Sequence, residues 1–216
     1  MLQKTIAPLL IGLLLSSAHL SAAKPGEIDR PTSQPYKGDL SIFEGSDREE
    51  KLQVQRVMDL LGIKSGSVVA DIGAGSGWFT VRAARRVGPS GQILAVEINP
   101  DAIRYIDARA KKEKLANIRT VRGTGDDPKL PPQSVDAVLL LKTYHEVAQP
   151  IALLRHVKAA MRPGALLGII DRNGKGNDHG LNADVVIKEA RRAGFTLVSQ
   201  NDFVKGDDVD YFLIFR

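Results

Sequence analysis

"VADIGAGSGWFT", residues 69–80, is the stretch that decides the fold of this 216-residue chain. A short apolar segment ends at Asp71, and glycines then occupy positions 73, 75 and 77. Glycine adopts positive φ at little steric cost and lets the backbone approach a ligand closely. Ligands of open parallel sheets bind beyond the carboxyl ends of the strands, where a following helix offers free N–H groups. The stretch therefore predicts a strand, a ligand-binding turn and a helix.

The spacing of the glycines indicates the kind of ligand. A dinucleotide turn has the pattern G-x-G-x-x-G, whose third glycine allows tight packing of helix on strand. Here that third position is Trp78, and Asp71 would repel a pyrophosphate. An acid at this place suits a ligand with a positive group beside a nucleoside, such as an α-amino group. Glu97 ends the next predicted strand, where a carboxylate accepts hydrogen bonds from ribose hydroxyls.

Predicted strands and helices alternate over residues 48–216, which is typical of βαβ units. We therefore expect an α/β fold with a mostly parallel sheet and helices on both faces. Only residues 205–209 join the last two strands, too few for a parallel crossover, so these strands should form a hairpin. The predicted helices are 48–63, 78–87, 100–115, 149–161 and 181–194, and the predicted strands are 67–73, 92–98, 117–123, 134–143, 165–172, 195–204 and 210–216.

The residues before this domain have a different character. Lys4, an apolar run over 6–15 and small residues ending at Ala23 predict a secretory signal peptide over residues 1–23. The apolar run is shorter than the roughly 20 residues that span a bilayer, which favours cleavage over an uncleaved anchor. We therefore expect an exported protein, periplasmic or secreted, whose mature chain has no transmembrane segment. Residues 24–47 are rich in Pro, Gly, Ser and Asp and are interpreted as a linker or lid.

Composition excludes several kinds of chemistry. The chain has no cysteine, so cysteine nucleophiles, thiolate metal sites and CxxC redox chemistry are absent. The formal net charge of +5 is mild for this length. The basic clusters over 82–86 and 109–119 lie in predicted helices and are interpreted as solvated faces, so we do not expect a nucleic-acid partner.

Four segments, in order, resemble the successive motifs of a known family. They are "VVADIGAGSGWFT", "ILAVEINP", "GTGDDPKLPPQSVDAVLLL" and "MRPGALLGIID". Together they resemble class I S-adenosylmethionine-dependent methyltransferases, and the resemblance runs over about 48–216. It implies a Rossmann-like, seven-stranded sheet whose last strand is antiparallel, in agreement with the predicted hairpin. It also implies S-adenosylmethionine as the cofactor.

The same resemblance implies a role for each matching residue. The three glycines would line the methionine and ribose part of the cofactor, and Asp71 would lie near its amino group. Glu97 would hold the ribose, with Ile98 against the adenine. Thr124 stands where the family often has its first acid after strand three, so one of the next two acids would receive the adenine amino group. The implied cofactor-binding residues are Asp71, Gly73, Gly75, Gly77, Glu97, Ile98, Asp126 and Asp127.

Residues that face the methyl acceptor should follow the fourth and fifth strands. Methyl transfer depends largely on alignment, and a base is needed only if the acceptor loses a proton. Tyr144 and His145 follow strand four, either as pocket wall or as groups that orient the acceptor, and Asp171 and His179 follow strand five in a polar loop. His145, Asp171 and His179 have no recognised metal-ligand spacing, so no metal site is predicted.

The sequence thus predicts S-adenosylmethionine-dependent methyl transfer to a small-molecule or lipid-like acceptor. The lack of cysteine argues against a thiol-based arsenite enzyme, and no "NPPY" segment supports methylation of nucleobase or glutamine nitrogen. Export conflicts with a cofactor made in the cytosol, which keeps an exported, non-catalytic nucleotide- or S-adenosylmethionine-binding module as an alternative. An NAD-dependent dehydrogenase is the second alternative.

Overall fold

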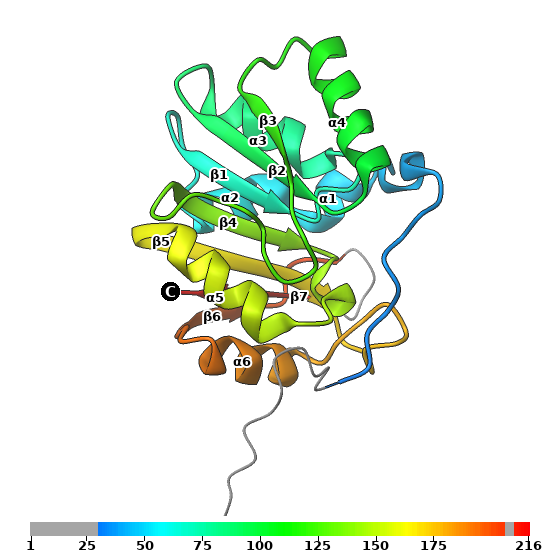
Figure 1. The fold of residues 1–216 in the computed structure, drawn as a ribbon, viewed down its shortest axis with the longest axis vertical. Coiled ribbons are helices and arrows are strands. Elements are labelled where there is room, and N and C mark those ends of the chain that lie inside the picture. The colour runs from blue at the N-terminus through cyan, green and yellow to red at the C-terminus, as the bar shows by residue number, and fades with distance from the viewer. Residues whose placement is uncertain (1–29, 206–209) are drawn as a thin grey trace, which may run out of the picture.

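The computed structural model describes residues 30–205 and 210–216 of the chain (Figure 1). Its strands form one seven-stranded sheet in the order β3-β2-β1-β4-β5-β7-β6. The strands are β1 (Val68–Ile72), β2 (Gln92–Glu97), β3 (Ile118–Arg122), β4 (Val135–Leu141), β5 (Met161–Arg172), β6 (Leu197–Asn201) and β7 (Asp210–Phe215). The helices are η1 (Leu40–Phe43), α1 (Arg48–Leu52), α2 (Val54–Leu60), α3 (Trp78–Val87), α4 (Pro100–Lys112), η2 (Tyr144–Glu146), α5 (Pro150–Ala160) and α6 (Ala183–Arg192).

The sheet confirms the predicted α/β, Rossmann-like fold. Neighbouring strands from β3 through β5 pair in parallel, whereas β7 pairs antiparallel with both β5 and β6. The predicted terminal hairpin is therefore present. The strand order reverses between β1 and β4, which is the place where ligands bind in open sheets of this kind.

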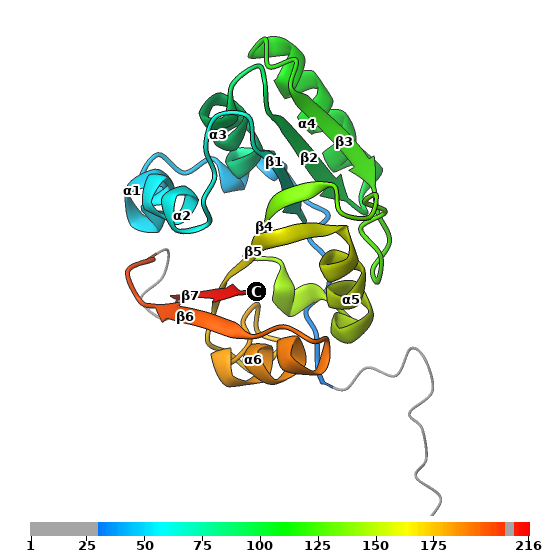
Figure 2. The ribbon, with the colours of Figure 1, turned by 90° about the vertical axis from the view of Figure 1, so that its left-hand side faces the viewer.

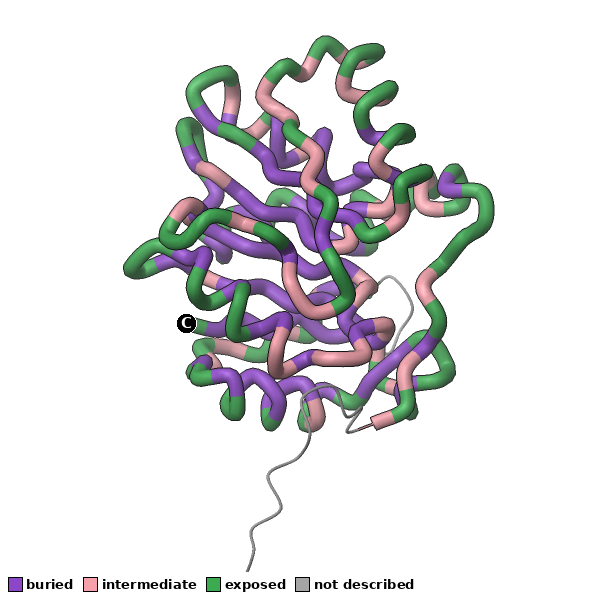
Figure 3. Tube along the Cα trace, viewed as in Figure 1, coloured by how far each residue is buried: buried purple, intermediate pink, exposed green. Residues whose placement is uncertain are grey.

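Two apolar cores lie on the two faces of the sheet. Alternate residues of β1 point to opposite faces: Val69 packs with α1, α2 and α3, whereas Ala70 packs with α5 and α6. Helix α4 lies against β2 and β3, where Ile106 contacts Ala95. Figure 2 shows α1 and α2 on one side of the sheet and α5 on the other. Buried residues run through the strands, and exposed residues follow the outer sides of the helices (Figure 3).

The predicted helix over 48–63 is two helices. Gln53 adopts a left-handed conformation, with φ 46° and ψ 50°, and separates α1 from α2. Its neighbours Leu52 and Val54 are only 2% and 3% exposed. Residues two apart point about 200° away from each other on a continuous helix, so only a break lets both enter the same core.

Residues 30–46, which we call the strap, cross the carboxyl ends of the strands (Figure 1). Arg30 fixes the start of the strap, because its Nε lies 2.8 Å from Oε1 of the buried Glu189 on α6. Glu44 fixes its other end by accepting hydrogen bonds from Arg109 and from Ser76 Oγ. The strap is the described part of the segment interpreted as linker or lid, and residues 1–29, including the predicted signal peptide, lie outside the described residues.

Candidate functional site

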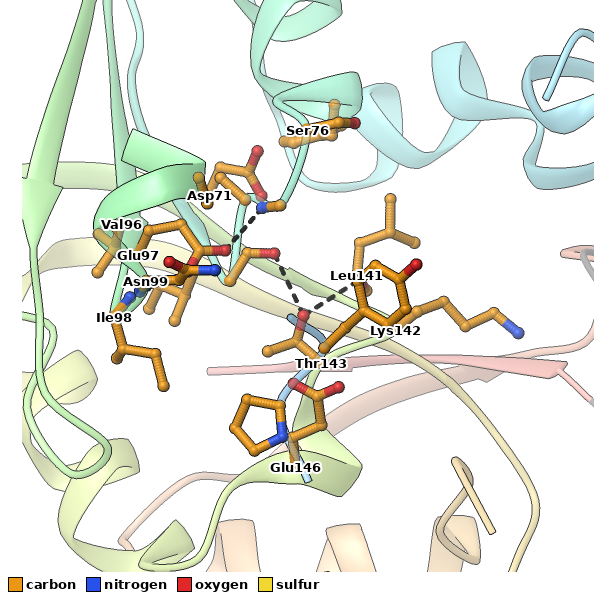
Figure 4. Close-up of a pocket in the computed structure, with 18 of the residues that line it drawn as sticks. Asp71, Ser76, Val96, Glu97, Ile98, Asn99, Leu141, Lys142, Thr143 and Glu146 are labelled. Carbon is orange, nitrogen blue, oxygen red and sulfur yellow. Dashed lines mark hydrogen bonds between the residues drawn. The ribbon is translucent and has the colours of Figure 1, made fainter. Parts of the chain in front are cut away.

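A pocket opens at the switch point between β1 and β4, beneath the strap (Figure 4). Its walls come from the turns after β1, β2, β3 and β4 and from the strap. The lining side chains include three acids and two cations. The lining residues used below are Tyr36, Phe43, Arg48, Asp71, Gly73, Gly75, Glu97, Ile98, Thr124, Gly125, Thr143 and Glu146.

The predicted glycine turn forms one wall of this pocket. Gly73, Gly75 and Gly77 have φ values of 71°, 58° and 75°, a region that side chains with a Cβ rarely adopt. At Gly73 there is also no room for one, since an added Cβ would lie 2.3 Å from Cγ2 of Thr143. Gly73 and Gly75 line the pocket, whereas Gly77 caps α3 and packs near Ile106.

Glu97 lies at the end of β2 with its carboxylate beside the glycine turn. Its Oε1 accepts a 2.7 Å hydrogen bond from the Gly75 amide, and its Oε2 accepts one of 3.0 Å from the Ile98 amide. The Asn99 amide donates a further, 3.4 Å bond to Oε2. A carboxylate oxygen has two lone-pair sites, so Oε1 keeps capacity for one more donor. The side chain is thus held in place while it can still accept from a ligand such as a ribose.

Asp71 lies at the bottom of the pocket and is 2% exposed. Thr80 Oγ1 donates a 2.5 Å hydrogen bond to its Oδ2. Burial raises the pKa of Asp71 to about 7, because desolvation of the charged form outweighs the hydrogen bond from Thr80. An acid kept partly neutral in this way gains by pairing with a cationic group of a ligand.

Arg48 is a pocket residue that the sequence analysis missed. Its guanidinium lies 4.6 Å from the centroid of the Trp78 ring and 5.9 Å from that of Phe43. Burial lowers its pKa to about 10, so it remains a cation at neutral pH. It can therefore bind an anionic ligand group such as a carboxylate. Nothing in the amphipathic pattern of α1 distinguishes it from a surface arginine.

Of the three residues predicted to contact the adenine, only Ile98 lines the pocket. This side chain lines the pocket and is 39% exposed. Asp126 and Asp127 are not among the lining residues. Asp126 accepts a 2.7 Å hydrogen bond from Thr124 Oγ1, and Asp127 pairs with Lys129 at 2.7 Å. Thr124 and Gly125 line the pocket in their place.

Of the four predicted acceptor-side residues, Tyr144 points away from the pocket. It is fully buried, and its hydroxyl donates a 2.8 Å hydrogen bond to Oε2 of Glu189. Arg30 pairs with the same carboxylate and lies 5.4 Å from the Tyr144 ring centroid. Tyr144 therefore anchors the strap to α6 and, unlike the predicted acceptor-side position, does not line the pocket.

Asp171 also has a different place from the predicted one. It is fully buried behind His145 and does not face an acceptor. Its Oδ1 lies 2.8 Å from Nδ1 of His145, and its Oδ2 accepts a 3.0 Å hydrogen bond from the His145 amide. Asp171 thus positions the imidazole. His179 lies in the exposed loop after β5, with its ring centroid 5.8 Å from that of His145.

Glu146 is the acceptor-side residue that lines the pocket itself. Figure 4 shows its carboxylate beside Thr143, on the far side of the cavity from the glycine turn. Burial raises the pKa of this carboxyl group to about 7, although the nearby His145 acts in the opposite direction. Glu146 directly follows the predicted residues Tyr144 and His145, and nothing in its sequence position shows that it lines the pocket.

The sheet order, the glycine turn and the carboxylates of Asp71 and Glu97 together define a Rossmann-like domain with a pocket suited to a nucleoside with a positive group. Residues 69–164 match the family described as "Methyltransferase domain". This match, together with the relatives and the solved structure below, supports the class I S-adenosylmethionine-dependent methyltransferase family that the motifs predict.

Relatives with known names agree with this family. A ubiquinone/menaquinone biosynthesis C-methyltransferase from Pasteurella multocida is 27% identical over 53% of this chain and 43% of its own length. Nocamycin O-methyltransferase from Saccharothrix syringae is 28% identical over 53% of this chain and 41% of its own length. The match thus spans less than half of these relatives.

A solved structure shares the whole fold. The crystal structure of a SAM-dependent methyltransferase from Aquifex aeolicus superposes with a TM-score of 0.74 and 23% identity, covering 83% of this chain and 98% of the other. No helix among the described residues has both the length and the apolar character needed to cross a membrane.

Proposed function

We propose that this protein transfers the methyl group of S-adenosylmethionine to a small-molecule or lipid-like acceptor. The observation that carries the proposal is that Asp71, Glu97 and the glycine turn line the same pocket, with Glu97 hydrogen-bonded to Gly75. This arrangement offers carboxylates to a cationic amino group and to a ribose, and the same carboxylates would repel a pyrophosphate. Family membership supports the same cofactor.

The pocket fits the chemical groups of this cofactor. Asp71 and Arg48 offer opposite charges at one end, matching an α-amino and an α-carboxylate group. Glu97 would accept from the ribose hydroxyls, and Ile98 would pack against the adenine. S-adenosylmethionine supplies an activated methyl group when bound. The chain contributes alignment, because the strap covers the pocket while Thr143, packed against Gly73, and Glu146 line it.

The names of the relatives support the class of acceptor. Ubiquinone and menaquinone precursors are lipid-like, and the O-methyltransferase is named for a small natural product. The pocket is open beside Tyr36 and Phe43 of the strap, whose rings lie 5.3 Å apart at 75°. These aromatic side chains would supply an apolar surface for such an acceptor. We propose no nucleic-acid partner.

Calorimetry of the purified chain tests the cofactor assignment. S-adenosylmethionine and S-adenosylhomocysteine should bind, and NAD should not. Glu97→Ala should weaken S-adenosylmethionine binding by about tenfold or more, because a hydrogen bond to a charged group contributes roughly 1.5–3 kcal/mol. Glu50→Ala is the matched control, since Glu50 is exposed on α1. Tight NAD binding, or unchanged affinity in a folded Glu97→Ala protein, would contradict the proposal.

Methyl transfer itself needs a separate assay. The protein should move labelled methyl groups from S-adenosylmethionine to a component of a lipid and metabolite extract of its host. Binding without any transfer would support the alternative of a non-catalytic module. That assay therefore separates an enzyme from a binding protein.

We also propose that the protein is exported, on the basis of the predicted signal peptide over residues 1–23. Fractionation of the host followed by N-terminal sequencing should find a mature chain that begins near Lys24 outside the cytosol. Recovery of an intact chain beginning at Met1 in the cytosol would refute export, and it would remove the conflict with the site of cofactor synthesis.

A further inference from the structure

Two histidines and a glutamate meet at the acceptor end of the pocket. His145 and Glu146 come from the turn after β4, and His179 comes from the loop after β5. One ligand atom from each side chain lies within 4.8 Å of the other two. Nε2 of His145 is 3.9 Å from Oε1 of Glu146, and the two imidazole rings are nearly perpendicular.

The first ligand of this cluster is fixed in the form that binds a metal. Asp171 accepts backbone N–H bonds from His145 at 3.0 Å and from Arg172 at 2.9 Å, so its carboxylate acts as an acceptor. Nδ1 of His145, 2.8 Å from the same carboxylate, must then carry the proton. Nε2 is left with its lone pair, directed at the cluster. A carboxylate behind a histidine is the usual outer partner of a metal-binding imidazole.

One residue of the strap holds both histidine backbones. The Ser33 amide donates to the His145 carbonyl at 3.2 Å. Ser33 Oγ accepts from the His179 amide at 2.9 Å and donates to the Gly176 carbonyl at 2.9 Å. His179 has a φ of 56°, which is uncommon for a residue other than glycine. Three distant segments thus cooperate to bring His179 to His145.

We propose that His145, Glu146 and His179 form a binding site for one divalent transition-metal ion, with Zn²⁺ as the best match. Two imidazoles and one carboxylate are a ligand set that such ions prefer, and three protein ligands leave a coordination position open. With metal–ligand distances of about 2.0 Å, tetrahedral ligand atoms lie about 3.3 Å apart. The cluster therefore needs a closure of roughly 1.5 Å at most, which rotation of the exposed His179 and the half-buried Glu146 side chains would supply.

The position of the site gives the ion a task in methyl transfer. Glu146 lines the cofactor pocket, so the open coordination position would lie on its acceptor side. A bound ion lowers the pKa of an attached acceptor hydroxyl group, so its proton would pass to solvent without a separate base. The oxygen would then form a bond to the methyl carbon as the sulfur–methyl bond breaks, and S-adenosylhomocysteine would leave. This consequence rests on the proposed function, whereas metal binding does not.

Metal binding is measured on the full chain, purified with an affinity tag that contains no histidine and treated with a chelator. Calorimetric titration with Zn²⁺ should show one ion per chain. Titration with Co²⁺ should give visible absorption from nitrogen and oxygen ligands without thiolate bands, since the chain has no cysteine. Absence of saturable binding would overturn the proposal.

Variants of single residues test whether Zn²⁺ binds at the proposed site. His179→Ala should weaken Zn²⁺ binding by tenfold or more, and its exposed position keeps the fold intact. Asp171→Asn should weaken Zn²⁺ binding by about 10–100-fold, because it removes the carboxylate that accepts from Nδ1 of His145. His156→Ala, in the exposed face of α5, is the matched control and should bind as the parent does.

Equal affinity in the His179→Ala and His156→Ala proteins would overturn the proposal, with circular dichroism confirming the fold of each. S-adenosylmethionine affinity is measured on the same samples without metal. A failure of the proposed function would appear as loss of S-adenosylmethionine binding, and a failure of the metal site as loss of Zn²⁺ binding. The two failures can therefore be distinguished.

Discussion

The protonation state of the Asp71 carboxyl group makes the proposed cofactor binding depend on pH. The free protein holds this carboxyl group at a pKa of about 7, because its charged form is desolvated. A ligand amino group at Asp71 would favour the ionised form and lower that pKa. Binding must then release protons between that lowered pKa and about 7, and Asp71→Asn should abolish this release.

The size of the effect follows from linkage. With a pKa of about 7, Asp71 is about 90% protonated at pH 6, so binding should release about 0.9 proton per chain. Affinity should rise about fivefold between pH 6 and pH 7 as the carboxyl group ionises. Above pH 7 the gain should level off, because the ligand amino group then begins to lose its own proton.

Calorimetry at pH 6 in buffers of different ionisation enthalpy measures the released protons directly. Glu146 is the other pocket acid whose pKa is raised to about 7, so Glu146→Gln is measured as the control and should keep the release. Release of less than about 0.3 proton, or an equal release from Asp71→Asn, would refute the assignment of Asp71 as the partner of the amino group.

Three further variants test other contacts. Gly73→Ala should destabilise the fold by more than about 1 kcal/mol in urea unfolding, since it adds a Cβ at φ 71° that lies 2.3 Å from Thr143 Cγ2; an unchanged midpoint would contradict the turn geometry. Glu189→Ala should cost about 3–5 kcal/mol in the same assay because it leaves the buried Arg30 unpaired, and a loss below 1 kcal/mol would show the strap to be loosely held. His145→Ala should lower turnover while S-adenosylmethionine affinity stays within about twofold, because His145 does not line the pocket; loss of affinity would instead make it pocket wall.

The sequence by itself determined the order of the elements, the sheet type and the cofactor end of the site. Residues 78–87 were predicted as a helix and are α3, because helical spacing of apolar residues and a following Gly88 are local signals. The glycine turn and Glu97 could likewise be predicted from the sequence as parts of the pocket. They sit at strand ends, and the carboxyl ends of parallel strands meet at one edge of the sheet.

Tertiary structure alone decided which polar side chains face that edge. Asp126 and Asp127 are adjacent to pocket residues in the chain, yet both side chains are used in the turn before β4. Local turn bonds of this kind compete with a ligand for the same carboxylates. Sequence position therefore placed them near the pocket, but it did not place them in it.

The residues on the acceptor side show most clearly that sequence position does not determine where a side chain points. Tyr144, His145 and Glu146 are consecutive, yet they point to α6, to Asp171 and into the pocket. A three-residue turn of 3₁₀ helix sends neighbouring side chains about 120° apart, so the backbone path sets each direction. Ser33 shows that such contacts can be distant in sequence, because its bonds to segments more than 100 residues away exist only once the strap lies across the strand ends. Periodicity is a local property of a chain, whereas such contacts depend on how the finished sheet brings its loops together.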